Sequence, residues 1–176
     1  MASFATSYIP TVASQVTRAA DNASMIGNNF ARWYNVNEGT LYGDAYSLAT
    51  AGTGGFAGGL FNISGSGSDR TSLFVGAANS PRAESVVSGA VAYGLNNGTA
   101  FPGVFYKNAL AYKVNDFAFS TNGAAPSVDN SGPVLPGAVS ILLGGAFGPG
   151  SLNGTIKRFA YYNRRLSNTE LQGITS

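Results

Sequence analysis

Gly154-Thr-Ile-Lys-Arg-Phe-Ala-Tyr-Tyr-Asn-Arg-Arg-Leu-Ser-Asn-Thr-Glu-Leu171 is the stretch of sequence that decides the fold of this 176-residue chain. Its first half, together with the three residues before it, predicts a strand over residues 151–162, with Ile156 and Phe159 as core anchors. Strict alternation would place residues three apart on opposite faces of a strand. We therefore expect a β-bulge or twist between these two anchors.

The second half of the stretch carries the signature of a helix start. Ser167 and Glu170 have the spacing of a capping box. In this motif the Ser hydroxyl accepts a hydrogen bond from the backbone N–H three residues on, while the Glu side chain reaches back. We expect a short helix over residues 168–174, with Leu171 and Ile174 turned inward, and little helix elsewhere.

Outward from this stretch, apolar and polar residues alternate as they do in strands. The clearest segment is 103–114, and the residues on one side of it are Val104, Tyr106, Leu110, Tyr112 and Val114. A turn at Asn115-Asp116 leads to a partner strand that begins at Phe117 and closes at Asn122-Gly123. Further strands are expected over residues 40–48, 60–63, 73–75, 86–93 and 139–143, and a proline-containing loop over 124–137.

Composition narrows the class of protein. Glycine is abundant at 24 residues and 44% of the chain is hydrophobic, which favours short strands and tight turns over disorder. Cys and His are absent, which excludes disulfides, a thiolate nucleophile and a histidine base or metal ligand. The net charge of +2 is too small to predict binding to nucleic acid or to an anionic membrane. No apolar run approaches the length of a transmembrane helix.

The closing stretch resembles the last segment of laminin-G-like, concanavalin-like β-sandwich domains. The residues that carry the resemblance are Gly154, Ile156, Phe159, Tyr162, Asn163, Arg164, Leu166, Ser167 and Glu170. The hairpin over residues 110–123 also fits, at the family's usual distance upstream. The resemblance implies an all-β jelly-roll sandwich with one short C-terminal helix, formed here as a single domain by residues 21–176.

A second resemblance lies near the N-terminus. Phe4-Ala-Thr-Ser-Tyr-Ile-Pro-Thr11, followed by Val16-Thr-Arg-Ala-Ala-Asp21, is similar to a phrase that precedes concanavalin-like domains in bacteriophage and prophage structural proteins. It implies a non-enzymatic virion structural protein, displayed on the capsid, tail or fibre. We expect residues 1–20 to form an extended arm that attaches the domain to other virion proteins or to further copies in a homo-oligomer. The apolar side chains of this arm are Phe4, Tyr8 and Ile9.

Aromatic residues beside amides suggest a second role, as a receptor-recognition module of a tail fibre that binds bacterial surface carbohydrate. The candidate ligand-binding residues are Trp33, Tyr34, Asn35, Tyr106 and Asn108. Aromatic faces pack against sugar rings and amides bond to hydroxyls, typically at shallow sites carried by loops. The alternative is that Trp33 and Tyr106 pack in the core or at the rim of the sandwich, as large aromatic residues usually do.

Catalytic and metal sites are weaker hypotheses. The eight acidic residues are Asp21, Glu38, Asp44, Asp69, Glu84, Asp116, Asp129 and Glu170. None are two to four residues apart, so no single strand offers the carboxylate pair of a polysaccharide depolymerase. A pair from distant strands, separated by about 5–10 Å, is left open. No cofactor is expected, and the only candidate ligands for calcium, which needs several oxygen atoms, are Asp44 and Asp129 with loop carbonyls.

Overall fold

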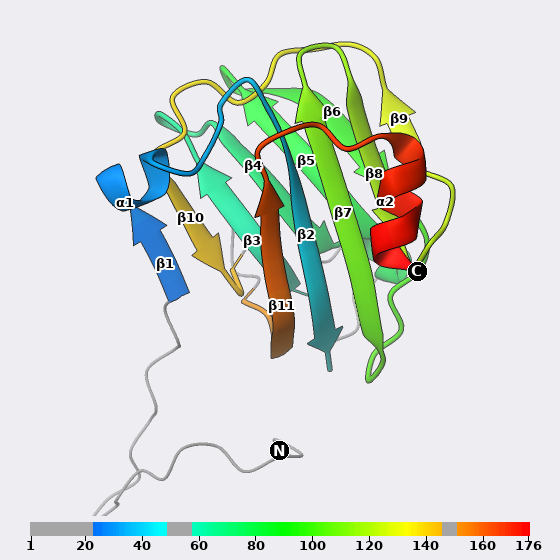
Figure 1. Ribbon diagram of the computed structural model, residues 1–176. Coiled ribbons are helices and arrows are strands. Elements are labelled where there is room, and N and C mark those ends of the chain that lie inside the picture. Colours follow the sequence, from blue (N-terminus) through cyan, green and yellow to red (C-terminus); the bar gives the residue numbers. More distant parts are fainter. Residues whose placement is uncertain (1–22, 49–57, 146–150) are drawn as a thin grey trace, which may run out of the picture.

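The computed structural model describes residues 23–48, 58–145 and 151–176. Over these ranges two antiparallel sheets pack face to face, and the helix α2 (Asn168–Thr175) lies against the outside of one of them (Figure 1). This arrangement confirms the predicted all-β jelly-roll sandwich with one short C-terminal helix. The predicted arm, residues 1–20 with Phe4, Tyr8 and Ile9, lies outside the described residues.

The strand order brings together segments that are distant in sequence. The six-stranded sheet runs β1 (Ala23–Ile26), β10 (Ser140–Leu143), β3 (Gly58–Ser64), β4 (Arg70–Val75), β5 (Pro81–Val87) and β6 (Ala90–Asn96). The five-stranded sheet runs β11 (Gly154–Tyr162), β2 (Glu38–Ser47), β7 (Phe105–Lys113), β8 (Phe117–Thr121) and β9 (Ser127–Asp129). Two short helical turns, α1 (Asn28–Ala31) and η1 (Ala77–Asn79), lie between strands. The closing stretch therefore forms an edge strand beside β2.

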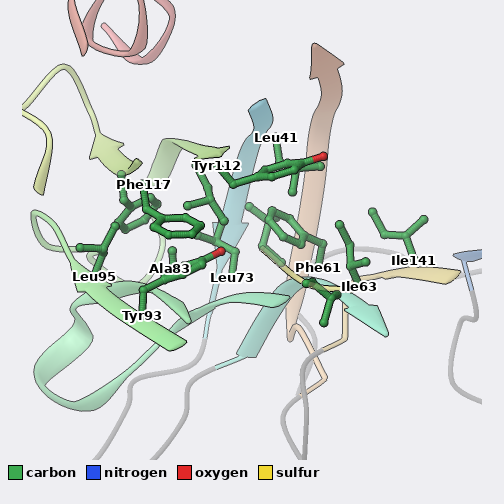
Figure 2. Packing of buried hydrophobic residues seen from close by; sticks show 14 of the residues in the cluster. Leu41, Phe61, Ile63, Leu73, Ala83, Tyr93, Leu95, Tyr112, Phe117 and Ile141 are labelled. Atoms are coloured by element: carbon green, nitrogen blue, oxygen red, sulfur yellow. The ribbon is translucent and has the colours of Figure 1, made fainter. Parts of the chain in front are cut away.

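The core lies between the two sheets and takes side chains from both (Figure 2). Six of its members, each 3% exposed or less, are Leu41, Phe61, Ile63, Leu73, Tyr112 and Phe117. Burial of one such apolar side chain is worth about 1.5–3 kcal/mol, so this layer holds the sheets together. Tyr93 of β6 stacks on Phe117 of β8 with ring centroids 4.3 Å apart, which closes one side of the sandwich.

The alternation predicted for residues 103–114 is confirmed inside the strand and fails at its ends. Tyr106, Leu110 and Tyr112 of β7 point into the core. Val104 and Val114 lie just beyond the two ends of β7 and are 55% and 52% exposed. Alternation predicts a side chain's direction only where the ladder continues, and the ladder stops one residue short of each valine.

The predicted bulge in the closing stretch is confirmed. The pairing of β11 with β2 shifts between Ile156 and Arg158, so that Lys157 is the extra residue. The shift lets Ile156 and Phe159 both pack against the core, although they are three residues apart.

The capped helix is also confirmed, and it ends one residue later than predicted. The Ser167 hydroxyl accepts from the Glu170 backbone N–H at 3.3 Å, and the Glu170 carboxylate accepts from the Ser167 N–H at 2.8 Å. Leu171 is fully buried in a second apolar cluster, where Ala109 and Ala111 of β7 leave room for the helix. In the described ranges, no helix has the length and apolar character needed to cross a membrane.

The structure differs from the sequence prediction in three segments of the chain. The polar segment 21–30 contains β1 and the start of α1, and the predicted loop 124–137 contains β9. The single strand expected over 86–93 is two strands, β5 and β6. They are joined at Ser88 and Gly89, whose φ angles of 53° and 76° make a tight turn.

Candidate functional site

Three of the five predicted ligand-binding residues are core residues. Tyr34, Tyr106 and Asn108 are 8%, 2% and 0% exposed. Burial raises the pKa of the Tyr106 hydroxyl to about 12. Tyr34 stacks on Phe30 with ring centroids 4.7 Å apart. All three side chains point into the sandwich and present no face to a sugar at the surface, so the structure favours the packing alternative for them.

The other two, Trp33 and Asn35, fasten the connection between α1 and β2 to the sandwich. The half-buried Trp33 ring packs edge-on against Tyr161 with centroids 4.9 Å apart, and its Nε1 donates to the Met25 sulfur at 2.7 Å. The Asn35 backbone N–H donates to the Tyr161 hydroxyl at 2.8 Å, and the Asn35 carbonyl accepts from the Tyr112 hydroxyl at 2.6 Å. These contacts give both residues a packing role.

Every acidic residue in the described ranges has a hydrogen-bond or ion-pair partner. Glu84 binds Arg70 and Arg82 at 3.4 and 3.0 Å, and Asp116 binds Arg165 at 2.7 Å. The remaining five are Glu38, Asp44, Asp69, Asp129 and Glu170, which meet lysine, arginine, backbone N–H or serine donors. These partners give most of the carboxylates in the described ranges a structural role.

The two calcium candidates do not converge. Asp44 lies on β2 and Asp129 on β9, with β7 and β8 between them. Three strand spacings separate the two by at least about 14 Å, whereas calcium needs its ligands at about 2.3–2.6 Å from one centre. Among the described residues no group of three or more Asp or Glu side chains gathers in a way that could hold a metal ion. The hypothesis that these two residues share a calcium ion is therefore wrong.

A different set of side chains gathers on the outer face of the five-stranded sheet. Tyr42, Asp44 and Tyr46 alternate along β2 and point away from the core, because Leu41 and Ala45 between them point into it. Side chains from β7 and β11 join them. We call this set the outer-face patch; its members are Tyr42, Asp44, Tyr46, Phe105, Lys157 and Arg158.

Pairing across strands assembles the aromatic part of the patch. Tyr46 lies directly opposite Phe105 of β7, and their ring centroids are 5.3 Å apart. Phe105 is 48% exposed, so about half of this residue is accessible to solvent. Gly154 lets β11 and β2 approach each other closely at this end of the sheet, because any Cβ there would collide with the Tyr46 carbonyl oxygen.

The β-bulge brings two cations to the same face. Because Lys157 is the extra residue, both it and Arg158 lie over the outer face instead of alternating. The Lys157 ammonium is 5.6 Å from the Phe105 ring centroid and 4.0 Å from Asp44 Oδ2. The Arg158 guanidinium is 5.6 Å from the centroid of the Tyr42 ring. The same pair of contacts would not form on a regular strand.

Asp44 is the least satisfied charged group of the patch. The residue is 7% exposed, and its Oδ1 atom is buried with no hydrogen-bond partner. Its ion pair with Lys157 is long, and the lysine side chain is 67% exposed. A buried carboxylate oxygen without a donor is costly, so a ligand group that donates to it gains free energy.

A groove adjoins the patch along the open side of the sandwich. It lies between the edge strands β1 and β11 and has a volume of about 570 Å³, with a smaller apolar pocket of about 250 Å³ beside it. Leu143, Leu152 and Phe159 line the larger groove, which Lys157 and Arg158 also border. These two cations therefore belong to both the groove and the outer-face patch.

Sequence reasoning missed the outer-face patch, although part of its signal is visible. The pattern Tyr42-Gly-Asp-Ala-Tyr46 alternates polar or aromatic residues with small ones, which indicates that Tyr42, Asp44 and Tyr46 share one face of a strand. Phe105 and Lys157 join that side only through the pairing of β2 with β7 and β11. No local pattern gives that register.

No protein-family model matches the sequence, and no curated protein matches it. Solved structures share its fold. One is the native heptameric SAP-like pentraxin from Limulus polyphemus, with a TM-score of 0.59 and 13% identity over 80% of this chain and 70% of that chain. A second is the CBM40 of the Ruminococcus gnavus IT-sialidase bound to alpha2,3 sialyllactose, with a TM-score of 0.67 and 17% identity over 89% and 97%.

A third is Domain 4 of AbnA, a GH43 extracellular arabinanase from Geobacillus stearothermophilus, in complex with arabinotriose. Its TM-score is 0.66, with 14% identity over 82% of this chain and 69% of that chain. At such identities the similarity establishes the concanavalin-like sandwich fold and nothing finer.

Proposed function

We propose that this domain is a non-enzymatic carbohydrate-binding domain and that the outer-face patch is its binding site. The observation that carries the proposal is the buried Asp44 carboxylate, with one oxygen lacking a donor, in the same patch as the half-exposed ring of Phe105. The patch offers a polar anchor and an apolar platform side by side.

Each group in the patch matches a part of a sugar. A pyranose ring has a face of C–H bonds that packs on an aromatic ring such as Phe105 or Tyr46. Sugar hydroxyls donate to carboxylates such as Asp44, and such charge-assisted hydrogen bonds are about twice as strong as neutral ones. Lys157 and Arg158 donate to sugar oxygens from the edge of the patch.

Two of the similar structures support a carbohydrate ligand. The Ruminococcus gnavus CBM40 holds alpha2,3 sialyllactose, and Domain 4 of AbnA holds arabinotriose. They support the class of ligand, whereas the position of the site rests on the residues of this chain alone.

The proposal includes no catalytic step. Glycoside hydrolysis requires one carboxyl group that donates a proton and a second that acts as base or nucleophile. Glu84, Asp116 and Glu170 are each bound to arginine in the folded domain. Among the described residues, Asp44 is the carboxylate that has a buried oxygen without a hydrogen-bond partner, and one such group suits binding better than hydrolysis.

For the biological setting we propose the surface of a phage virion, as part of a capsid decoration, tail or fibre. The support is the N-terminal phrase with Phe4, Tyr8 and Ile9. In this setting the arm attaches the domain to its neighbours, and the patch recognises carbohydrate on the bacterial surface.

Deletion of residues 2–12 tests the attachment. We expect the shortened chain to keep the unfolding midpoint of the full chain and to lose its association with purified particles, because the arm supplies the apolar contact. Normal association of the shortened chain with particles would contradict the role of the arm and leave the carbohydrate site untouched.

A glycan array tests the binding site. We expect the full chain to bind a subset of bacterial surface glycans, and Phe105→Ala and Asp44→Asn each to weaken binding by about tenfold or more, or roughly 1.4 kcal/mol. Val128→Ala is the matched control, because Val128 is 49% exposed on β9, at the far edge of the same sheet. If no glycan binds, or if Phe105→Ala binds like the control, the proposed site is wrong.

A further inference from the structure

Lys157 and Arg158 have little or no carboxylate to neutralise them, in contrast to the two arginines that precede α2. Arg164 and Arg165 each lie 2.7 Å from a carboxylate oxygen. Lys157 approaches Asp44 only to 4.0 Å, and Arg158 has no carboxylate within ion-pair distance among the described residues. The outer-face patch thus holds two cations and one carboxylate, an excess of one positive charge.

The position of this excess charge is fixed by the fold. Both cations lie at the bulge of β11, and the Lys157 ammonium lies over the Phe105 ring. The Arg158 guanidinium lies over the Tyr42 ring, which limits its freedom before any ligand arrives. A guanidinium is a planar fork that binds a carboxylate through two parallel hydrogen bonds, so a pre-positioned one favours an anionic partner.

We propose that the sugar bound by the outer-face patch is acidic, a residue of a carboxylate-bearing polysaccharide. Arg158 and Lys157 bind its carboxylate, neighbouring hydroxyls donate to Asp44, and the C–H face of the ring packs on Phe105. This inference rests on the proposed carbohydrate function and adds to it the charge of the ligand.

Asp44 favours an acidic sugar over a nucleic acid, the other common polyanion. Its carboxylate lies on β2, between the strand that carries both cations and the strand that carries Phe105, and it repels a chain with a phosphate at every nucleotide. A sugar acid spaces its charges more widely and brings hydroxyl donors for the carboxylate. The small net charge of +2 points the same way.

Calorimetric titration with polygalacturonate and with its carboxyl-reduced form tests the inference. The two polymers share linkage and length and differ in the carboxylate. We expect polygalacturonate to bind at least about tenfold more tightly and to weaken as salt rises from about 50 to 500 mM, because exposed cations are screened. An oligothymidylate of similar charge is expected to bind more weakly than polygalacturonate.

Variants assign the effect to the two cations. Arg158→Gln and Lys157→Gln are each expected to reduce the preference for polygalacturonate over its reduced form by about tenfold. Arg32→Gln, which removes an exposed cation next to α1, is the matched control and is expected to keep the preference. The Lys157 and Arg158 side chains are exposed, so the unfolding midpoint of each of these two variants is expected to equal that of the unsubstituted chain.

Each other outcome overturns the inference in a recognisable way. Equal or tighter binding of the reduced polymer, or of another neutral glycan on the array, shows that the site is for neutral sugars; the proposed function then stands. Tighter binding of oligothymidylate shows a general polyanion surface. No binding of polygalacturonate, with no glycan bound on the array, removes the proposed function as well.

Discussion

At the scale of single residues, Gly154 determines how closely β11 approaches β2 beside the outer-face patch. A Cβ at this position would overlap the Tyr46 carbonyl oxygen across the β11–β2 pair. The structure places it as the first residue of β11. Its lack of a side chain is needed for close approach of two backbones.

We predict that Gly154→Ala destabilises the domain by about 1–3 kcal/mol, because the two strands must move apart. Gly173→Ala is the matched control: Gly173 lies on the exposed side of α2 with no atom within 4 Å of the added methyl. There alanine is expected to stabilise by about 0.5–1 kcal/mol, since it is the better helix former. Urea unfolding measures both; equal effects of the two substitutions would contradict this account.

Alternation in the sequence indicates which way a side chain points within a strand. It does not indicate which residue lies opposite on the neighbouring strand. Tyr106 and Asn108 share the parity of Leu110 and Tyr112, so the alternation indicates their burial, although both were proposed as ligand-binding residues. The place of Phe105 in the outer-face patch could not be predicted in this way, because it depends on pairing with Tyr46, nearly sixty residues earlier.

At the scale of elements, the closing strand and helix were the most predictable part of the chain. The capping box fixed the start of α2, and the three-residue spacing of Ile156 and Phe159 indicated the bulge. β1 was missed because its four residues are all exposed and its sequence, Ala-Ser-Met-Ile, does not alternate. It exists because β10 offers it a free edge.

We predict that the attachment of α2 weakens in acid through Glu170. Hydrogen bonds from Arg164, and then from the Ser167 backbone, lower the pKa of Glu170 from 4.5 to about 2. A lowered folded-state pKa contributes stability above pH 4.5 that is lost as the pH falls toward 2.

Thermal unfolding of the wild type and Glu170→Gln between pH 6 and pH 2 measures this contribution. The wild type is expected to have the higher midpoint at pH 6, and the difference is expected to shrink as the pH falls, since the glutamine does not ionise. A difference that stays constant across this range would contradict the role assigned to the Glu170 carboxylate.

At the scale of the whole molecule, the two sides of the sandwich differ. The Tyr93–Phe117 stack closes the side formed by β6 and β8. On the opposite side, a groove lies between β1 and β11. The bulge on β11 places Lys157 and Arg158 at this open side, next to the outer-face patch. The fold class followed from periodicity and from the resemblance of the closing stretch; the asymmetry is a consequence of sheet order, which periodicity does not encode.

The most direct test of the central claim is a two-dimensional amide NMR spectrum of the labelled domain, recorded with and without the glycan that binds best on the array. The account predicts that the largest shifts belong to the six residues of the outer-face patch, Tyr42, Asp44, Tyr46, Phe105, Lys157 and Arg158. Largest shifts around Trp33 and Asn35, around Val128, or no shifts with any array glycan would contradict it.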